Sequence, residues 1–154
     1  MFLEFEFRSF PSDAASTQSL PVRGDGYVYV LFWKHADRQV PFYVGQTNRL
    51  AERICDYLAA NYAASTDFKV GEAIKYLRRR KLDVTLAYMR SDDCRHEERY
   101  WIRSLHLAGF MLLNDFGGYN YKSDQVSSEL LALQNYCAIL LGDAPLAVPQ
   151  FPRP

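Results

Sequence analysis

Two adjacent glutamates in the segment "HEERYWIRSL" (96–105) are the first candidates for chemistry. On a helix with 100° per residue, Glu98 points into an apolar stripe and Glu97 lies about 100° away from it. The apolar side chains within about 60° of Glu98 are Cys94, Trp101, Ile102 and Leu105. A carboxylate in such a stripe costs free energy unless it is paired, hydrogen-bonded or bound to a metal. The position therefore predicts either a buried ion pair with an arginine or a metal ligand.

A second candidate is a ridge on the helix expected after residue 48, where Arg49, Arg53 and Tyr57 recur every four residues. Side chains with this spacing are neighbours on a helix surface. A guanidinium at the border between core and solvent can hold a phosphate in two-point contact. The alternative is an arginine whose stem covers apolar atoms.

The basic run "RRRK" (78–81) has two interpretations as well. By default it is the solvated end of a helix, where cations complement the macrodipole. The alternative is a patch that contacts phosphates through Arg78, Arg79 and Arg80. Eighteen basic residues balance eighteen acidic ones, so bulk charge does not attract the chain to nucleic acid or to an anionic membrane. Any polyanion site must therefore be a local patch.

Several other kinds of site lack the residues they need. His96 and Glu97 begin an H-E-x-x-H pattern, but position 100 is a tyrosine, which excludes a zinc protease of that type. No glycine pattern of a dinucleotide or P-loop site is present. The cysteines are three in number and widely separated, which argues against a disulfide framework or a zinc ribbon: Cys55, Cys94 and Cys137.

The cysteine usage fits a reducing cytoplasm, and the N-terminus does not have the charge pattern of a signal peptide. No apolar run approaches membrane-spanning length. We therefore expect a cytoplasmic protein that does not bind membranes.

The elements that must position these residues form one domain, because 154 residues with 49% hydrophobic side chains suffice for one real core. Alternating patterns predict a short edge strand at 2–8 and strands at 27–33, 41–45 and 82–89, with 34–40 as a long hairpin loop. Capping residues and apolar stripes predict helices from 47 or 48 to about 61, over 69–80, over 93–108 and over 124–141.

This order predicts an α+β fold in which a small, mainly antiparallel three-stranded sheet is flanked by helices. A short N-terminal strand and a C-terminal helix are additions to it. We divide the chain into an N-terminal extension (1–25), a core domain (26–121), and a C-terminal helix with a proline-rich tail (122–154).

Tyrosines are the remaining candidates. Tyr27 and Tyr29 are two residues apart and share one face of the first long strand, while Tyr43 lies where the second strand ends. Phenol hydroxyls near an arginine and a buried glutamate would form a site that suits a phosphate and a metal.

Taken together and in this order, these residues resemble the GIY-YIG nuclease family. The motifs that carry the resemblance are Tyr27-Val28-Tyr29, Tyr43-Val44-Gly45, Arg53 with Tyr57, Glu98, and Asn114 of "LLN". The similarity covers roughly residues 26 to 120 and is closest to the N-terminal nuclease domain of the bacterial excision-repair endonuclease. Tyr27 departs from the pattern, since it stands where the family has a glycine.

The resemblance implies a metal-dependent endonuclease that hydrolyses phosphodiester bonds. Its catalytic residues would be Tyr29, Tyr43, Arg53, Tyr57, Glu98 and Asn114. Glu98 would hold Mg²⁺ or Mn²⁺, and the nucleic acid would be contacted by Arg49, Arg53, Arg78, Arg79 and Arg80.

The expected partner is DNA, branched or damaged, with RNA as an alternative. A second copy of the chain or another protein would supply specificity. Two competing interpretations are a nucleic-acid-binding module that keeps this fold without turnover, and a structural domain whose tyrosines are only core.

Overall fold

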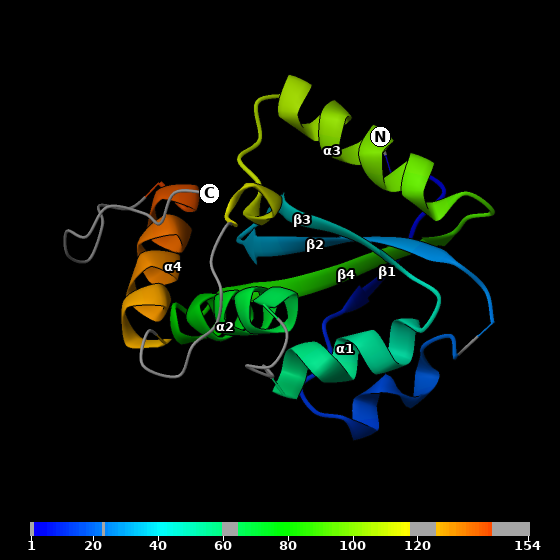
Figure 1. Ribbon diagram of the computed structural model, residues 1–154, viewed down its shortest axis with the longest axis horizontal. Coiled ribbons are helices and arrows are strands. Elements are labelled where there is room, and N and C mark those ends of the chain that lie inside the picture. The colour runs from blue at the N-terminus through cyan, green and yellow to red at the C-terminus, as the bar shows by residue number, and fades with distance from the viewer. Residues whose placement is uncertain (1, 23, 60–64, 118–125, 143–154) are drawn as a thin grey trace.

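The computed structural model describes residues 2–22, 24–59, 65–117 and 126–142. Their strands form one antiparallel sheet with the order β1-β4-β2-β3 (Figure 1). The strands are β1 (Glu6–Ser9), β2 (Tyr27–His35), β3 (Arg38–Thr47) and β4 (Asp83–Arg90). The predicted α+β class is confirmed. The predicted number of three strands is wrong for the described residues, because the N-terminal strand pairs with β4 and becomes a fourth member of the sheet.

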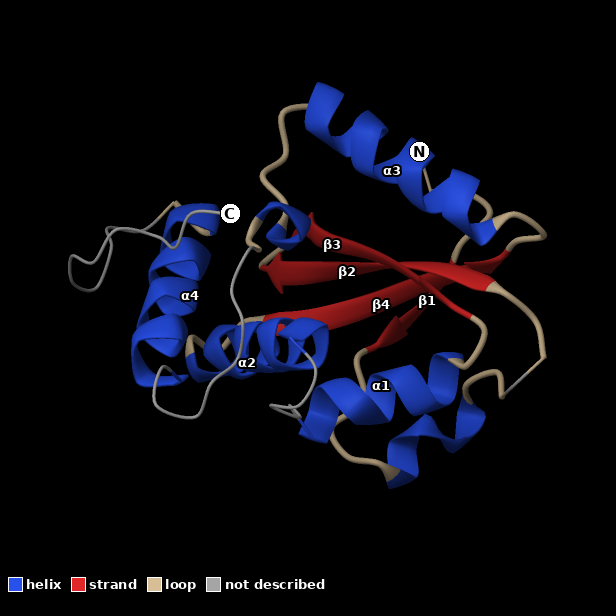
Figure 2. Cartoon of the chain, in the orientation of Figure 1, coloured by secondary structure: helices blue, strands red, loops and turns tan. Residues whose placement is uncertain are grey.

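The helices of the described residues are α1 (Leu50–Ala59), α2 (Ser65–Arg79), α3 (Cys94–Leu107) and α4 (Val126–Leu140). Two short 3₁₀ helices, η1 (Ala15–Ser19) and η2 (Leu113–Asp115), connect them to the sheet. Helix α3 covers one face of the sheet, while α1 and α2 lie on the other side (Figure 2). None of these helices is both long and apolar enough to cross a lipid bilayer. The proline-rich tail lies outside the described residues.

The loop that connects β2 and β3 is shorter than the sequence predicted. His35 pairs with Arg38, so only Ala36 and Asp37 form the turn, with Ala36 at a φ of 54°. The long loop predicted at 34–40 is therefore wrong. Its residues are polar because the hairpin extends beyond the core into solvent, where backbone pairing continues although the side chains are exposed.

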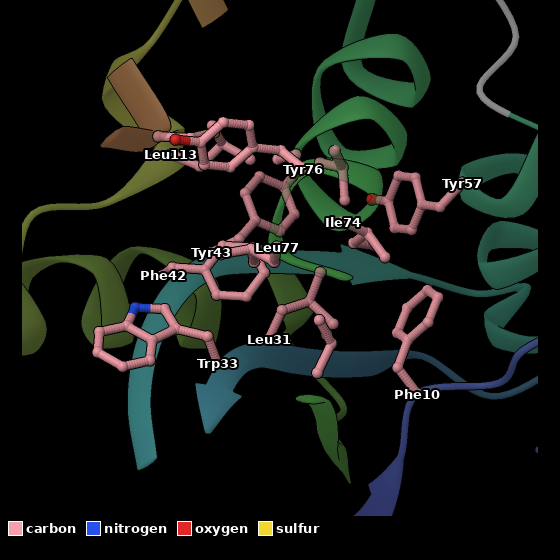
Figure 3. Packing of buried hydrophobic residues seen from close by; sticks show 14 of the residues in the cluster. Phe10, Leu31, Trp33, Phe42, Tyr43, Tyr57, Ile74, Tyr76, Leu77 and Leu113 are labelled. Atoms are coloured by element: carbon pink, nitrogen blue, oxygen red, sulfur yellow. The ribbon is translucent and has the colours of Figure 1, made fainter. Parts of the chain in front are cut away.

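A bulge in β3 gives this strand two neighbouring aromatic residues on the same side of the sheet. Leu31 pairs with Tyr43 and Phe32 pairs with Pro41, which leaves Phe42 as the extra residue. Phe42 and Tyr43 consequently both join the core under α1 and α2 (Figure 3). Pro41 is tolerated because β3 is an edge strand and does not need every backbone donor.

The sheet separates two apolar layers. Val28, Val30 and Val44 face α3, and they pack with Trp101 and Leu105. Tyr29, Leu31 and Tyr43 have the opposite parity, so they face the other layer. Figure 3 shows part of this second layer, with Tyr57 pointing from α1 into the cluster. The alternation of the strands therefore decides which tyrosines can meet the helix that carries Arg53.

Candidate functional site

Three of the predicted site tyrosines meet at one end of the sheet. Tyr29 comes from β2, Tyr43 from β3 and Tyr57 from α1. Each pair of ring centroids is 6.3 to 6.4 Å apart, and the hydroxyls of Tyr29 and Tyr57 share a hydrogen bond. All three side chains are buried. The structure thus brings together residues that are up to 28 positions apart in the chain.

Gly45 is the position that allows this arrangement. It pairs with Tyr29 across the β2–β3 ladder. A Cβ atom at Gly45 would lie 2.4 Å from the ring carbon Cζ and the hydroxyl of Tyr29. The ring of Tyr29 therefore lies directly over the backbone of β3, and a glycine is needed at this point for steric reasons.

Arg53 lies on α1 one helical turn before Tyr57 and contacts the tyrosine cluster. Its guanidinium carbon lies 5.1 Å from the centroid of the Tyr57 ring, and its Nη1 lies 2.8 Å from Oδ1 of Asp67. Burial by itself lowers the pKa of Arg53, but Tyr57, Tyr29 and Asp67 outweigh it, and the net effect raises the pKa. The guanidinium is therefore a fixed positive charge at the edge of the phenol cluster.

Asp67 is a site residue that the sequence reasoning missed. It belongs to the first turn of α2, which begins at Ser65 rather than at the predicted residue 69. Only 8% of its side chain is exposed. The signal that could have found it is the segment "STD" before the apolar run, because carboxylates are favoured in the first turn of a helix.

The phenols themselves are neutral hydroxyls. Burial raises the pKa of Tyr29, of Tyr43 and of Tyr57, although the charge of Arg53 acts in the opposite direction on each. At neutral pH these groups can donate and accept hydrogen bonds, but none is ionised. They are suited to orient a water molecule or an anion rather than to act as phenolate bases.

The side chain of Asn114 bonds to the backbone of β3. Its Nδ2 donates to the carbonyl of Val44 at 2.7 Å, and its Oδ1 accepts from the Val44 amide at 2.9 Å. The side chain thus pairs with the open edge of β3 as a neighbouring strand would. Asn114 is a positioning residue that fixes the strand between Tyr43 and Gly45.

Glu98 lies on α3, on the other side of the β3 edge. It is half-buried rather than fully inside the apolar stripe, and burial raises the pKa of its carboxyl while Arg95 and Arg99 lower it. Burial is the main cause of the raised pKa of Tyr43, and the charge of Arg53 lowers it. The charge of Glu98 raises the same pKa, so Glu98 and Tyr43 lie within electrostatic reach of each other. The carboxylate forms no ion pair with any of the described residues, so the predicted arginine partner is not found among them.

A carboxylate of this kind fits a magnesium or manganese ion. Such ions are held in proteins by one or two carboxylates, and waters and substrate oxygens complete the coordination shell. Within the described ranges no three histidine, cysteine, aspartate or glutamate side chains gather in one place. A metal ion beside Glu98 would therefore have one hard oxygen ligand from the described residues, and not a closed protein cage.

A hollow of about 420 Å³ runs past the end of β3 between the beginnings of α1 and α3. Its lining includes Gly26, Gln46, Thr47, Asn48, Arg49, Arg53 and Cys94. Arg53 thereby reaches solvent on one side, while Cys94, one helical turn before Glu98, lines the other side. Arg49 lies at the rim, where it pairs with Glu52 at 3.0 Å. Of the candidate site residues, the hollow is therefore lined by Arg49 and Arg53, while Glu98 and the three tyrosines are not in its lining.

Lys69 is a second residue that the sequence reasoning missed. Its Nζ donates to the carbonyl of Phe116 at 2.8 Å and lies 6.0 Å from the centroid of the Tyr43 ring. Burial lowers the pKa of Lys69 to about 8, although Asp115 acts in the opposite direction. No local pattern in the sequence marks this lysine, because its partners come from other elements.

The basic run at the end of α2 is not part of this cluster. Arg78 donates to the carbonyls of Phe10 and Pro11 at 3.1 and 3.0 Å, and burial lowers its pKa. Arg79 and Arg80 are exposed at the same helix end. Asp67 and Arg78 are eleven positions apart on α2, and at 1.5 Å per residue this spacing corresponds to about 17 Å along the helix. The structure therefore leaves the predicted phosphate patch away from Arg53, and it gives Arg78 a structural task.

Compared with protein-family models, with curated proteins and with solved structures, the chain shows no significant match in any of the three. The fold and the site define an α+β protein with an antiparallel sheet, three buried phenols beside a fixed guanidinium that borders a hollow, and a half-exposed carboxylate on the neighbouring helix α3. These groups suit an anion next to a divalent cation.

Proposed function

We propose that the chain is a metal-dependent endonuclease of the GIY-YIG type, which hydrolyses phosphodiester bonds in DNA. The observation that carries the proposal is the meeting of Tyr29, Tyr43, Tyr57 and Arg53 at the end of β3, with Glu98 across the edge. The motif order adds support, because the sequence resembles this family at each of these positions. The family fold would cover the domain 26–121.

Arg53 is the group that would receive the scissile phosphate. It lies at the wall of the hollow, and its planar fork can hold two phosphate oxygens at once. Asp67 and the Tyr57 ring fix its orientation before a substrate arrives. Fixed charge of this kind stabilises a transition state without reorganisation during the reaction.

The tyrosine hydroxyls would orient the attacking water. The water oxygen bonds to phosphorus, the bond to the 3′ oxygen breaks, and the proton of the water is finally carried by the leaving 3′ hydroxyl. Tyr43 is the phenol within electrostatic reach of Glu98. Since Tyr43 is neutral, it accepts a hydrogen bond from the water and donates one onward.

Glu98 would hold Mg²⁺ or Mn²⁺, which when bound supplies Lewis-acid stabilisation of the charge that develops on the leaving oxygen. The half-exposed carboxylate leaves room for the waters that these ions keep. Asn114 takes part indirectly, because it holds the strand that carries Tyr43.

A second candidate function is a nucleic-acid-binding module without turnover. One observation favours it, namely that Arg53 is already neutralised by Asp67 at 2.8 Å. A phosphate would have to compete with that carboxylate. In a third interpretation the chain is a structural domain, and its tyrosines only pack in the hydrophobic core.

The test is cleavage by the wild-type protein of plasmid DNA, branched DNA and RNA, each with Mg²⁺, with Mn²⁺ and with a chelator. We expect DNA to be cut with either metal and to stay intact with the chelator. Binding of nucleic acid without cleavage of any substrate would favour the binding module. Absence of both binding and cleavage would contradict both functions and leave the structural domain.

A further inference from the structure

Helix α3 carries three arginines that the site does not use. Arg95, Arg99 and Arg103 are spaced four residues apart, and each is exposed. Among the described residues none of the three forms an ion pair. In contrast, Arg49 pairs with Glu52 and Arg53 pairs with Asp67. Because the chain has no net charge, this row of arginines without ion pairs, here called the arginine ridge, is a local positive feature.

The ridge follows one flank of α3. On a helical wheel the three arginines lie about 60°, 100° and 140° from Glu98, in the direction away from Trp101. His106 falls in the same band and pairs with Asp115 of η2 at 2.8 Å. On the opposite flank, Trp101 stacks on Phe2 with ring centroids 4.7 Å apart.

These two contacts orient the helix. The neighbour of Asp115 in η2 is Asn114, whose side chain pairs with Val44 on the open edge of β3. The flank with His106 therefore faces the β3 edge, and the flank with Trp101 faces the N-terminal segment. Arg95 and Arg99 are also the cations that lower the pKa of Glu98. The arginine ridge thus begins beside Glu98 and runs along the side of α3 where β3 is open.

We propose that the arginine ridge binds the sugar-phosphate backbone of a nucleic acid and directs one strand across the β3 edge toward Glu98. This inference rests on the proposed function, and it names the surface that receives the substrate. From Arg95 to Arg103 the helix rises about 12 Å, a length over which one strand of a duplex carries about three phosphates. Regularly spaced guanidiniums match a polymer with regularly spaced anions. Such contacts fix register and orientation and carry no sequence information.

The first experiment compares two variants that lose the same charge. The ridge variant replaces Arg95, Arg99 and Arg103 with alanine, which is the best helix former and keeps α3 intact. The control variant replaces Lys34, Arg38 and Lys81 with alanine. These are exposed cations at the hairpin tip and at the end of α2, and they too form no ion pair with a described residue. Thermal melts confirm that both variants are folded.

Binding of a duplex oligonucleotide is measured by fluorescence anisotropy over a series of salt concentrations, with a chelator present so that cleavage does not interfere. For wild type we expect log affinity to fall with log salt. For the ridge variant we expect weaker binding and a slope smaller by about 2 to 3, since each lost phosphate contact removes about 0.9. The control variant keeps most of the wild-type slope.

A third variant, with lysine at all three ridge positions, keeps the charge and should retain most of the slope. Wild-type affinity and slope in the alanine ridge variant would overturn the inference. An equal loss in the control variant would do the same, because the effect would then be one of bulk charge. Failure of the wild type to bind any nucleic acid would overturn the proposed function as well. If the ridge variant loses binding but the wild type cuts no substrate, the binding role of the arginine ridge is supported and the proposed endonuclease activity is contradicted.

Discussion

The two faces of the sheet are covered by different kinds of side chain. On the α3 face, the strand residues that point inward are apolar, such as Val28, Val30 and Val44. On the face of α1 and α2, the core also contains buried tyrosines, and three of them (Tyr29, Tyr43 and Tyr57) have the Arg53–Asp67 ion pair at their edge. A buried polar group costs free energy unless it is well paired, so the second face is the more demanding one to build.

The difference teaches what the fold requires and what it does not. The α3 face shows that apolar residues alone can cover this sheet. On the other face Tyr29, Tyr43 and Tyr57 gather at one end with Arg53, while Leu31 and Trp33 farther along β2 are again apolar. Polar groups that the fold does not need are expected at functional sites. We infer that the phenol cluster is kept for its chemistry.

Deletion of one hydroxyl should separate chemistry from packing most strongly. Tyr43→Phe keeps the ring in the aromatic cluster, so the melting temperature should barely change. The cleavage rate should fall about 10²- to 10³-fold, the usual effect of removing one preorganised hydrogen-bonding group from a site. The matched control is Tyr88→Phe, because Tyr88 pairs with Tyr29 in the sheet but its hydroxyl bonds to Glu6. Equal rates for the two variants would contradict the assignment.

Truncation on the α3 face should have the opposite effect. Phe5 is buried and lies edge-on to Trp101, with ring centroids 5.2 Å apart. Phe5→Ala should lower the free energy of unfolding by about 3 to 5 kcal/mol, as measured by urea denaturation. Cleavage per folded molecule should not change. A tenfold loss of rate in the folded fraction would show that this face also serves the site.

Gly45→Ala tests the close approach of β3 and Tyr29. The added methyl group must displace the Tyr29 ring, so we expect a loss of about 1 to 3 kcal/mol in unfolding free energy together with slower cleavage. Gly117→Ala is the control, because nothing lies within 4 Å of a Cβ atom at that position. If Gly45→Ala is as stable and as active as the control, the contact with Tyr29 is not needed.

The smallest effect concerns pH. The pKa of Lys69 is lowered by burial from 10.5 to about 8, so above pH 8 the folded chain binds fewer protons than the unfolded chain. Lys69 should therefore contribute a rise of stability with pH above 8, while buried groups with a raised pKa, such as Cys137, contribute in the opposite direction. Lys69→Met should remove this rise, and Lys75→Met, at an exposed position, should keep it. Denaturation at several pH values between 8 and 9 measures the slope for the wild type and both variants, and the difference between the variants isolates the contribution of Lys69. If Lys69→Met shows the same dependence of stability on pH as the wild type, burial of Lys69 is not its cause.

The sequence predicted the parts of the fold and site that follow from local periodicity. The alternation of β2 was enough to expect Tyr27 and Tyr29 on one face, and the four-residue spacing of α1 was enough to expect Arg53 and Tyr57 side by side. The full burial of Tyr57 was not expected, because the ridge was predicted at the border between core and solvent. Contacts between distant segments were not predictable in this way. Arg78 looked like a solvated helix end, but its partners are carbonyls at least 67 residues away.

The role of Asn114 depends in the same way on tertiary structure. Its amide bonds to a strand edge 70 residues earlier in the chain. Asp67 was missed for a different reason, because the predicted helix began four residues late. The half-exposed state of Glu98 was also not predicted, since a helical wheel gives the direction of a side chain and not the depth of the layer that covers it.

The central claim is that the phenol cluster and Glu98 act together as a metal-dependent site. The most direct test compares Glu98→Gln with Glu97→Gln, which change adjacent residues of α3 by the same atoms. Calorimetric titration with Mn²⁺ and cleavage of DNA in Mg²⁺ are measured for both variants. We predict that Glu98→Gln loses the heat of Mn²⁺ binding and cuts no DNA, whereas Glu97→Gln keeps both. Wild-type cleavage by Glu98→Gln, or equal loss in the two variants, would contradict the claim.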